Sequence, residues 1–164
     1  SADSISFPDS LKYTTLHRHR TVYGGGGIMP DKFVPLDTAL YTPYYRDLMA
    51  KGVFNTFCLG YTNDHRKELQ KKYDTQDKFI KNFDVDDKMM GEFVAQGEKD
   101  GVPVNDNELA RSRTLIAAII KGIIGRDLFD TSTYFRIVNP LLNPIYREAL
   151  EIINSPEEYE KYLN

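Results

Sequence analysis

The spacing of hydrophobic residues changes about a quarter of the way along the chain. Up to about residue 40, β-branched and apolar residues form three short groups, Leu11–Leu16, Thr21–Tyr23 and Lys32–Pro35, which predict short strands between turns. Beyond that point, apolar residues recur with the 3.6-residue period of amphipathic helices. The sequence predicts a mainly α fold, a bundle of about six to eight helices after a short β-rich segment. We expect two domains, residues 1–40 and 41–164.

Local residues predict where the helices begin, because short polar side chains accept hydrogen bonds from free N–H groups and proline suits the first turn. The helix predicted to start at Thr131 or Ser132 should stop at Asn139-Pro140, since proline lacks an N–H donor. The predicted starts are Thr42 with Pro43, Thr75, Asp86 or Asp87, Asn105 or Asp106, Thr131 or Ser132, Pro144, and Ser155 with Pro156.

The strongest helical pattern follows Asn105 and should form the centre of the bundle. Its apolar residues follow the i, i+3, i+4, i+7, i+8 pattern of a wide buried face. Two glycines within it, Gly122 and Gly125, cost about 1 kcal/mol each relative to alanine. That cost predicts close backbone packing against a neighbouring helix, with a substrate groove as the alternative. The residues of the face are Ile116, Ile119, Ile120, Ile123 and Ile124.

Four consecutive glycines, Gly24 to Gly27, follow the predicted strand Thr21–Tyr23. Bare backbone N–H groups of such a loop can bind phosphate. Phosphate loops, however, continue into Gly-Lys-Ser/Thr and a helix, whereas these glycines lead into Ile28, Met29 and Pro30. A structural turn is therefore the better interpretation.

The residues around these glycines carry a family resemblance. Arg20-Thr-Val-Tyr-Gly-Gly-Gly-Gly-Ile-Met-Pro-Asp31 resembles the Gly-Arg-x-(Ile/Val)-x-Gly-x-Gly-Ile-x-Pro-Asp segment that closes the catalytic domain of carboxy-terminal processing (tail-specific) Ser-Lys peptidases. Phe7–Leu16 is similar to the preceding stretch in Bacteroidetes-type members, and the chain after about Tyr41 to their helical extension. One residue departs from the pattern, because His19 stands where the family usually has glycine, a residue that tolerates positive φ.

The resemblance implies that this chain is the non-catalytic C-terminal portion of a serine peptidase. In the family the nucleophilic Ser and the general-base Lys lie upstream of the glycine motif, so we expect no catalytic residue here and no activity of the chain alone. The parent would cleave proteins near their C-termini through an acyl-enzyme, without metal or cofactor, in the periplasm or cell envelope. Expected partners are the upstream catalytic domain, the parent's protein or peptide substrate, and a second copy of the chain.

A local Ser-Lys pair could replace the missing dyad. No serine has lysine at the third position after it. Ser10 and Lys12 are two residues apart, which on a strand places them on one face, although such pairs are usually solvated surface. We expect no catalysis from them.

Other reactive residues suggest structural roles. Cys58, the single cysteine, lies in an apolar stretch and is predicted to be a buried, inert thiol. His17 and His19 could share a metal, but no Cys, Asp or Glu nearby completes the shell, and His65 is predicted to be solvated. Asp84-Val-Asp-Asp87 lacks the glycine and glutamate of a calcium loop and is predicted to cap a helix. We expect no metal or cofactor site.

Composition narrows the possible classes of partner. A net charge of −3 argues against nucleic-acid binding, and no apolar run approaches membrane-spanning length. The N-terminal residues carry no signal-peptide pattern. Tyrosines near helix ends are typical of ordinary amphipathic packing. Tyr41, Tyr44 and Tyr45 could instead form a contact with the catalytic domain, which we favour, or a peptide-binding, partner or dimer surface.

Two alternatives to the peptidase interpretation stay open. A stand-alone helical protein-binding module predicts that the first 40 residues pack as an appendage on the helices. The peptidase interpretation predicts strands with unpaired edges and exposed apolar faces instead. A small hydrolase with an unrecognised site would need a cleft with a perturbed titratable group, for which the sequence offers no candidate.

Overall fold

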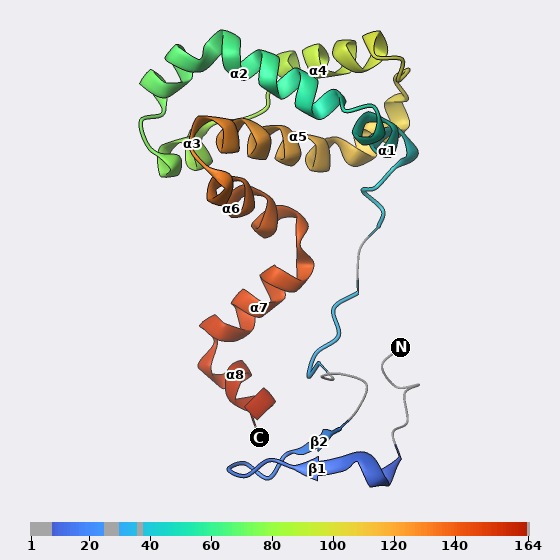
Figure 1. Cartoon of the computed structure of the whole chain (residues 1–164), viewed down its shortest axis with the longest axis vertical. Helices are drawn as coiled ribbons and strands as arrows, with labels where there is room; N and C mark the ends of the chain where they lie inside the picture. The colour runs from blue at the N-terminus through green and yellow to red at the C-terminus, as the bar shows by residue number, and fades with distance from the viewer. Residues whose placement is uncertain (1–7, 25–29, 36–37, 164) are drawn as a thin grey trace. The chain divides into compact units, whose positions relative to one another are not determined.

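A computed structural model describes residues 8–24, 30–35 and 38–163 of the chain (Figure 1). Within these residues the protein is mainly helical, with eight α-helices after a two-stranded antiparallel hairpin, so the predicted fold class is confirmed. A 3-10 turn, η2 (Asp9–Leu11), precedes the strands β1 (Lys12–Thr14) and β2 (Thr21–Tyr23). The helices are α1 (Pro43–Ala50), α2 (Val53–Lys72), α3 (Gln76–Asn82), α4 (Asp87–Lys99), α5 (Asp106–Leu128), α6 (Thr131–Leu142), α7 (Pro144–Asn154) and α8 (Pro156–Leu163).

Most of the predicted helix starts are confirmed by their capping hydrogen bonds. The side chains of Thr42, Thr75, Asp86 and Asn105 each accept a hydrogen bond from the backbone N–H three residues on. The predicted cap of α6 was wrong. Asp130 caps this helix, accepting from the Thr133 N–H at 3.1 Å, because a carboxylate one residue earlier can reach the same free N–H groups.

The predicted end of α6 at Asn139-Pro140 was also wrong. Pro140 lies inside the helix, which runs on to Leu142. Proline removes only its own N–H, and the following turn closes normally, with the N–H of Asn143 donating to the carbonyl of Asn139 at 3.0 Å. Pro140 is exposed, so its ring displaces no side chain of the core.

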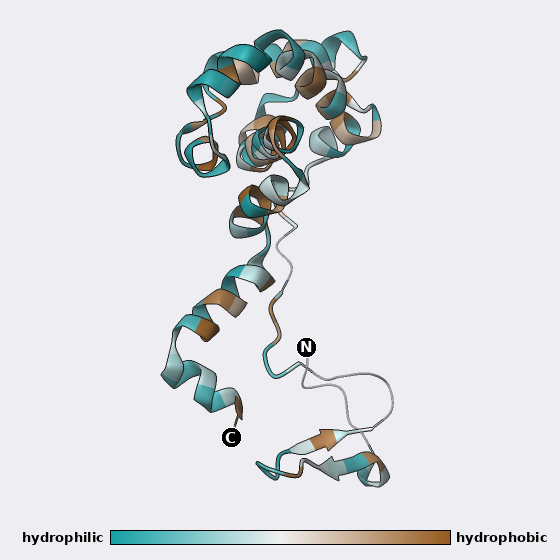
Figure 2. Ribbon diagram, turned by 60° about the vertical axis from the view of Figure 1, so that its left-hand side comes forward, coloured by the Kyte–Doolittle hydropathy of each residue, from teal (hydrophilic) through white to brown (hydrophobic). Residues whose placement is uncertain are grey.

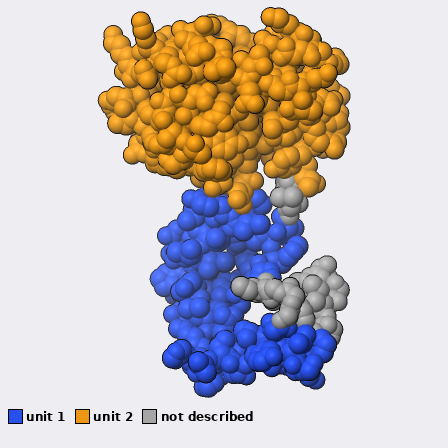
Figure 3. Space-filling view, viewed as in Figure 1, with its two compact units in different colours: residues 1–36, 144–164 blue, residues 37–143 orange. Residues whose placement is uncertain are grey.

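The chain forms two compact units, coloured separately in Figure 3. Unit 2, residues 37–143, holds α1 to α6 and all the buried hydrophobic side chains among the described residues. Its central element is α5, which contacts α1, α2, α3 and α6. The largest fully buried apolar side chains are Phe79, Phe93, Leu48, Leu115, Ile116, Ile120, Ile124 and Val53.

Two glycines allow α5 and α6 to approach closely. A Cβ atom on Gly122 would lie 2.8 Å from Cδ2 of Tyr134, and one on Gly125 would lie 2.9 Å from Cγ2 of Thr133. Both neighbours belong to α6, and such distances are shorter than a carbon–carbon contact allows. The predicted close packing is confirmed, and the alternative of a groove at these positions is wrong.

Unit 1 comprises residues 1–36 and 144–164 and holds the hairpin together with α7 and α8. Lys12 pairs with Tyr23 and Thr14 with Thr21 across the two strands. The strand predicted at Lys32–Pro35 is absent from this described segment. Lys32 instead pairs with Glu148 of α7, and the segment finds no partner strand among the described residues. The expected domains, 1–40 and 41–164, stay a prediction.

Candidate interaction surface

The single cysteine is unsuited to chemistry. Cys58 is fully buried in α2, with its Sγ 3.9 Å from the carbonyl of Ile120. Burial disfavours the thiolate and raises the pKa of the thiol to about 12. The prediction of a buried, inert thiol is confirmed.

The histidines form no metal site within the described part of the chain, where no group of three potential ligands occurs. His17 and His19 are both exposed. His65 is half-buried, so the prediction of a solvated ring was wrong. Its ring stacks on that of Tyr61 at 4.3 Å between centroids, and its Nδ1 lies 2.9 Å from the Tyr61 carbonyl one turn earlier.

Ser10 and Lys12 do not form the same-face strand pair on which the catalytic alternative depended. Ser10 lies in η2, ahead of β1, and both residues are exposed. The ammonium group of Lys12 lies 2.7 Å from the carboxylate of Asp9. Lys12 thus pairs with a surface carboxylate, and this geometry gives no support to a Ser10–Lys12 dyad.

The tyrosine cluster predicted as a contact surface lies largely in the core of unit 2. Tyr44 and Tyr45 are buried, and only Tyr41 is exposed, its ring meeting that of Tyr45 edge-on. Burial raises the pKa of both buried tyrosines. Consecutive residues 44 and 45 both point inward because α1 packs against both α2 and α5. The residue type alone did not indicate that Tyr44 and Tyr45 are buried.

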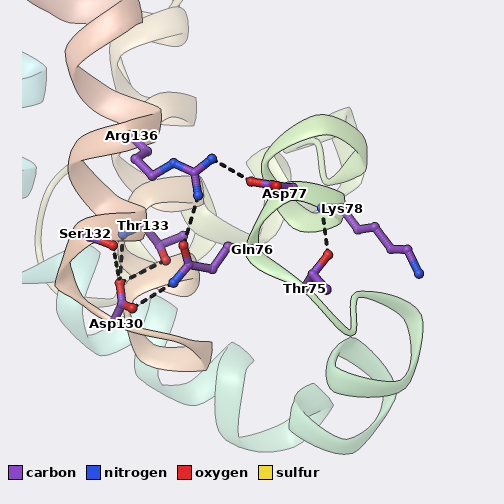
Figure 4. Close-up of polar contacts among 8 residues, drawn as sticks. All are labelled: Thr75, Gln76, Asp77, Lys78, Asp130, Ser132, Thr133 and Arg136. Atoms are coloured by element: carbon purple, nitrogen blue, oxygen red, sulfur yellow. Dashed lines mark hydrogen bonds and ion pairs between the residues drawn. The ribbon is translucent and has the colours of Figure 1, made fainter.

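A polar network joins α3 to the start of α6 (Figure 4). The carboxylate of Asp130 caps α6 and accepts from Nε2 of Gln76 at 2.7 Å. Arg136 donates to the side chains of Gln76 at 3.0 Å and Asp77 at 2.5 Å. Hydrogen bonds to Asp130 from the Ser132 hydroxyl, then from the Thr133 N–H and hydroxyl and from Gln76, lower the pKa of its carboxyl. Each polar group in this network contacts another protein group, which indicates a structural role.

A cavity of about 250 Å³ lies between α2 and α4 in unit 2. Carboxylates outnumber ammonium groups in its lining, which includes Glu68, Asp84, Asp86, Glu92, Lys72 and Lys88. Burial, and then the charges of nearby carboxylates, raise the pKa of Tyr61 on its wall. Although acidic groups predominate, no three potential metal ligands gather within the described residues, so this cavity has no evident ligand.

Exposed hydrophobic side chains are concentrated in unit 1. Among the described residues, fourteen large hydrophobic side chains are exposed, and nine of them lie in this smaller unit. None of its described residues is buried. Figure 2 shows hydrophobic residues along α7 and in the hairpin. The nine are Tyr13, Leu16, Val22, Phe33, Ile145, Tyr146, Leu150, Ile153 and Tyr159, which we call the open apolar surface.

Ion pairs join the N-terminal segment of unit 1 to its helices. Arg18 lies 3.1 Å from Glu160 of α8, and Lys32 pairs with Glu148 of α7. The hydrogen bond from Lys32 to Glu148 raises the lysine's pKa. Arg20 pairs with Asp31, so the first and last residues of the resemblance motif meet.

The glycine motif is described only at its edges, because Gly25 to Gly27, Ile28 and Met29 lie outside the described residues. Gly24 follows β2, and a Cβ there would lie 2.6 Å from the ring of Tyr13. His19 has a φ of 51°, in the left-handed region that favours glycine. His19 stands where the peptidase family usually has glycine. The backbone there has the positive φ that suits glycine, although the residue is histidine.

Comparison with known proteins gives a family and no activity. The model of a family of unknown function, DUF8443, matches residues 44–130, which run from the first turn of α1 to the cap of α6. No curated protein and no solved structure matches the chain. Within the described residues, no helix is long and apolar enough to span a membrane.

Proposed function

Because the chain belongs to DUF8443, a family of unknown function, its role must be inferred from its own residues, and we propose that it is the non-catalytic C-terminal region of a Ser-Lys tail-specific peptidase. In this proposal residues 1–40 complete the peptidase core, and the helices act as a scaffold that regulates access or assembly. The parent cleaves proteins near their C-termini in the periplasm or cell envelope. Its upstream catalytic domain is the principal partner of this chain.

The single observation that carries the proposal is the open state of the N-terminal strands. β1 and β2 form a two-stranded sheet, and Tyr13 and Val22 are 59% and 42% exposed. An isolated hairpin is marginally stable in water and usually packs against further strands or helices. Exposed strand edges and apolar faces are what the peptidase interpretation predicts when the rest of the core is missing.

The backbone at His19 supports the same proposal independently. Positive φ is uncommon for residues other than glycine. The peptidase pattern expects glycine at this position, and His19 is the one non-glycine residue with positive φ among those described. The shape of the turn therefore agrees with the motif even where the residue departs from it.

The test uses the natural polypeptide that contains this sequence. An antibody raised against the purified chain is used to isolate that polypeptide from its native cells, and its peptides are sequenced by mass spectrometry. We expect a polypeptide well above 18.9 kDa with upstream serine and lysine. It should cleave unstructured protein C-termini, whereas the purified chain should not. A native polypeptide of 18.9 kDa, or a larger one without peptidase activity, would contradict the proposal.

The second candidate is a stand-alone helical protein-binding module. The observation that favours it is the pairing of Arg18 with Glu160 and of Lys32 with Glu148, which places the N-terminal segment against helices. All four side chains are more than a quarter exposed, and surface pairs of this kind contribute little to stability. The native mass measured above also separates this candidate from the peptidase.

A further inference from the structure

We propose that a groove along α5 binds a small organic acid, a monocarboxylate with a short apolar body. The groove lies within unit 2 and has a volume of about 330 Å³. This volume is near the lower end of the range for ligand pockets, roughly 300–1,000 Å³, so a ligand with only a few carbon atoms suits it. The proposal goes beyond the function proposed above and does not depend on it.

Small and apolar side chains shape the groove. Arg113, Ala117 and Lys121 follow one another at intervals of four residues, so they lie along one face of α5. Ala117 lies between the two cations and leaves space above the helix. Val85, from the segment before α4, and Leu141, near the end of α6, line the same groove. Because α6 packs on α5 (Figure 1), these walls come from neighbouring elements of one unit.

The ammonium group of Lys121 is largely buried and weakly paired. Its side chain is 15% exposed, and its Nζ lies 3.8 Å from the carboxylate of Asp84, farther than a hydrogen bond reaches. The side chain of Asp84 is itself 89% exposed, so water screens the attraction. Burial lowers the pKa of Lys121, and the opposite charge of Asp84 reverses only part of that fall. An anion entering the groove would therefore stabilise the charged form of this lysine.

Arg113 adds a second positive charge to the lining. It lies eight residues before Lys121, about 12 Å along the helix axis. Its partner, Asp87, has a side chain that is 98% exposed. Both cations thus line the groove, whereas both paired carboxylates lie mostly in water.

This arrangement favours a carboxylate over other ligands. The charges of the lining complement an anion, and the apolar walls favour a hydrocarbon body attached to it. Leu141 is 51% exposed, so a ligand in the groove would cover apolar surface that now faces water. A phosphate would bring more charge and more acceptor oxygens than the single largely buried ammonium group matches.

The experiment titrates the full chain with isovalerate and follows the backbone amides by heteronuclear NMR. We expect saturable shifts at Ala117, Ala118 and Lys121, and much weaker binding of isovaleramide, which has the same shape without the charge. Lys121→Met keeps an unbranched side chain but removes the cation, so it should weaken binding about tenfold or more. Asp84→Asn removes a competing carboxylate and should tighten binding about twofold to fivefold.

The matched control is Lys78→Met. Lys78 also pairs with a carboxylate, that of Asp74, but it lies in α3 and does not line the groove. This variant should leave binding unchanged. Ala117→Leu places a larger side chain in the groove and should abolish binding, with thermal melting used to show that the variant is folded.

Four outcomes would overturn the proposal. They are the absence of saturable shifts, equal binding of the acid and the amide, undiminished binding by Lys121→Met, and weaker binding by Asp84→Asn. The last result would indicate that Asp84 attracts a positive group of the ligand. Tighter binding of a peptide that ends in leucine than of isovalerate would likewise overturn the assignment of a small acid.

Discussion

Both units contain amphipathic helices, but the apolar face is buried in unit 2 and exposed in unit 1. In unit 2, α5 buries Ile116, Ile120 and Ile124 completely, whereas in unit 1 the apolar residues Ile145, Leu150 and Ile153 of α7 remain 40–65% exposed. Both helices show the 3.6-residue period, so periodicity alone does not separate them. The difference is the number of neighbours. α5 packs against four helices, and α7 chiefly against α8. An amphipathic stripe thus indicates a face that is stabilised when another element covers it. Other helices cover such a face in unit 2, whereas in unit 1 it stays exposed.

The largest expected effect comes from truncating one phenylalanine in each unit. Phe79 is fully buried against Phe83 and Phe129, whereas Phe33 is 66% exposed. Phe79→Ala should lower the free energy of unfolding by about 3–5 kcal/mol, because a buried ring is lost and a cavity remains. Phe33→Ala should change it by less than about 0.5 kcal/mol. Urea unfolding followed by circular dichroism measures both. Similar losses for the two variants would mean that the units do not differ in burial.

A smaller contrast comes from adding one methyl group to a glycine in each unit. Around Gly125, Thr133, Phe79 and Ile137 are packed, and the new Cβ would lie within 3.2 Å of each. Gly125→Ala should destabilise the protein by about 1–3 kcal/mol through overpacking. Gly24→Ala meets only the ring of Tyr13, which is exposed and can turn away, so its effect should be close to zero.

Gly91→Ala controls for the general benefit of alanine in a helix. Gly91 lies in α4, and nothing comes within 4 Å of a Cβ placed there. This variant should stabilise unit 2 by about 0.5–1 kcal/mol, since glycine is unfavourable in a helix. If Gly125→Ala also stabilised the protein, the close α5–α6 packing would be refuted.

The last contrast, between two histidines of unit 1, predicts a small gain in stability. A left-handed backbone conformation costs a non-glycine residue about 1–2 kcal/mol. Replacing the residue with glycine removes this cost, but the greater conformational freedom of glycine in the unfolded chain offsets part of the gain. His19→Gly, at φ 51°, should therefore stabilise the hairpin by about 0.5–1 kcal/mol. Amide hydrogen exchange in β1 and β2 should slow about 2–5-fold. His17→Gly, where φ is not positive, should speed exchange, and equal effects from both variants would argue against backbone strain at His19.

Helix starts were predictable because capping is local. Thr42, Thr75, Asp86 and Asn105 each bond an N–H three residues away, a distance set by the helix itself. The exception is α6, because any of three consecutive polar residues, Asp130, Thr131 and Ser132, could serve as its N-cap. The local pattern narrowed the start to a few residues, and the geometry of the carboxylate selected Asp130.

Candidate site residues were less predictable, since their roles depend on distant neighbours. The residues of the open apolar surface come from both ends of the chain, and no spacing in the sequence indicates that Lys32 would meet Glu148. The burial of Tyr44 was missed for the same reason. Its backbone N–H donates to the carboxylate of Glu108 on α5 at 2.6 Å, a contact across 64 positions of sequence.

By itself the sequence determined the fold class, most of the helix starts, the buried thiol of Cys58 and the tight packing at Gly122 and Gly125. Each depends on residue chemistry acting within one or two turns, or on a composition that only a core tolerates. Only the tertiary structure decided which amphipathic faces are covered, because burial is a sum of contacts between segments far apart in the chain. The same periodic pattern therefore forms a core around α5 and leaves an open face on α7.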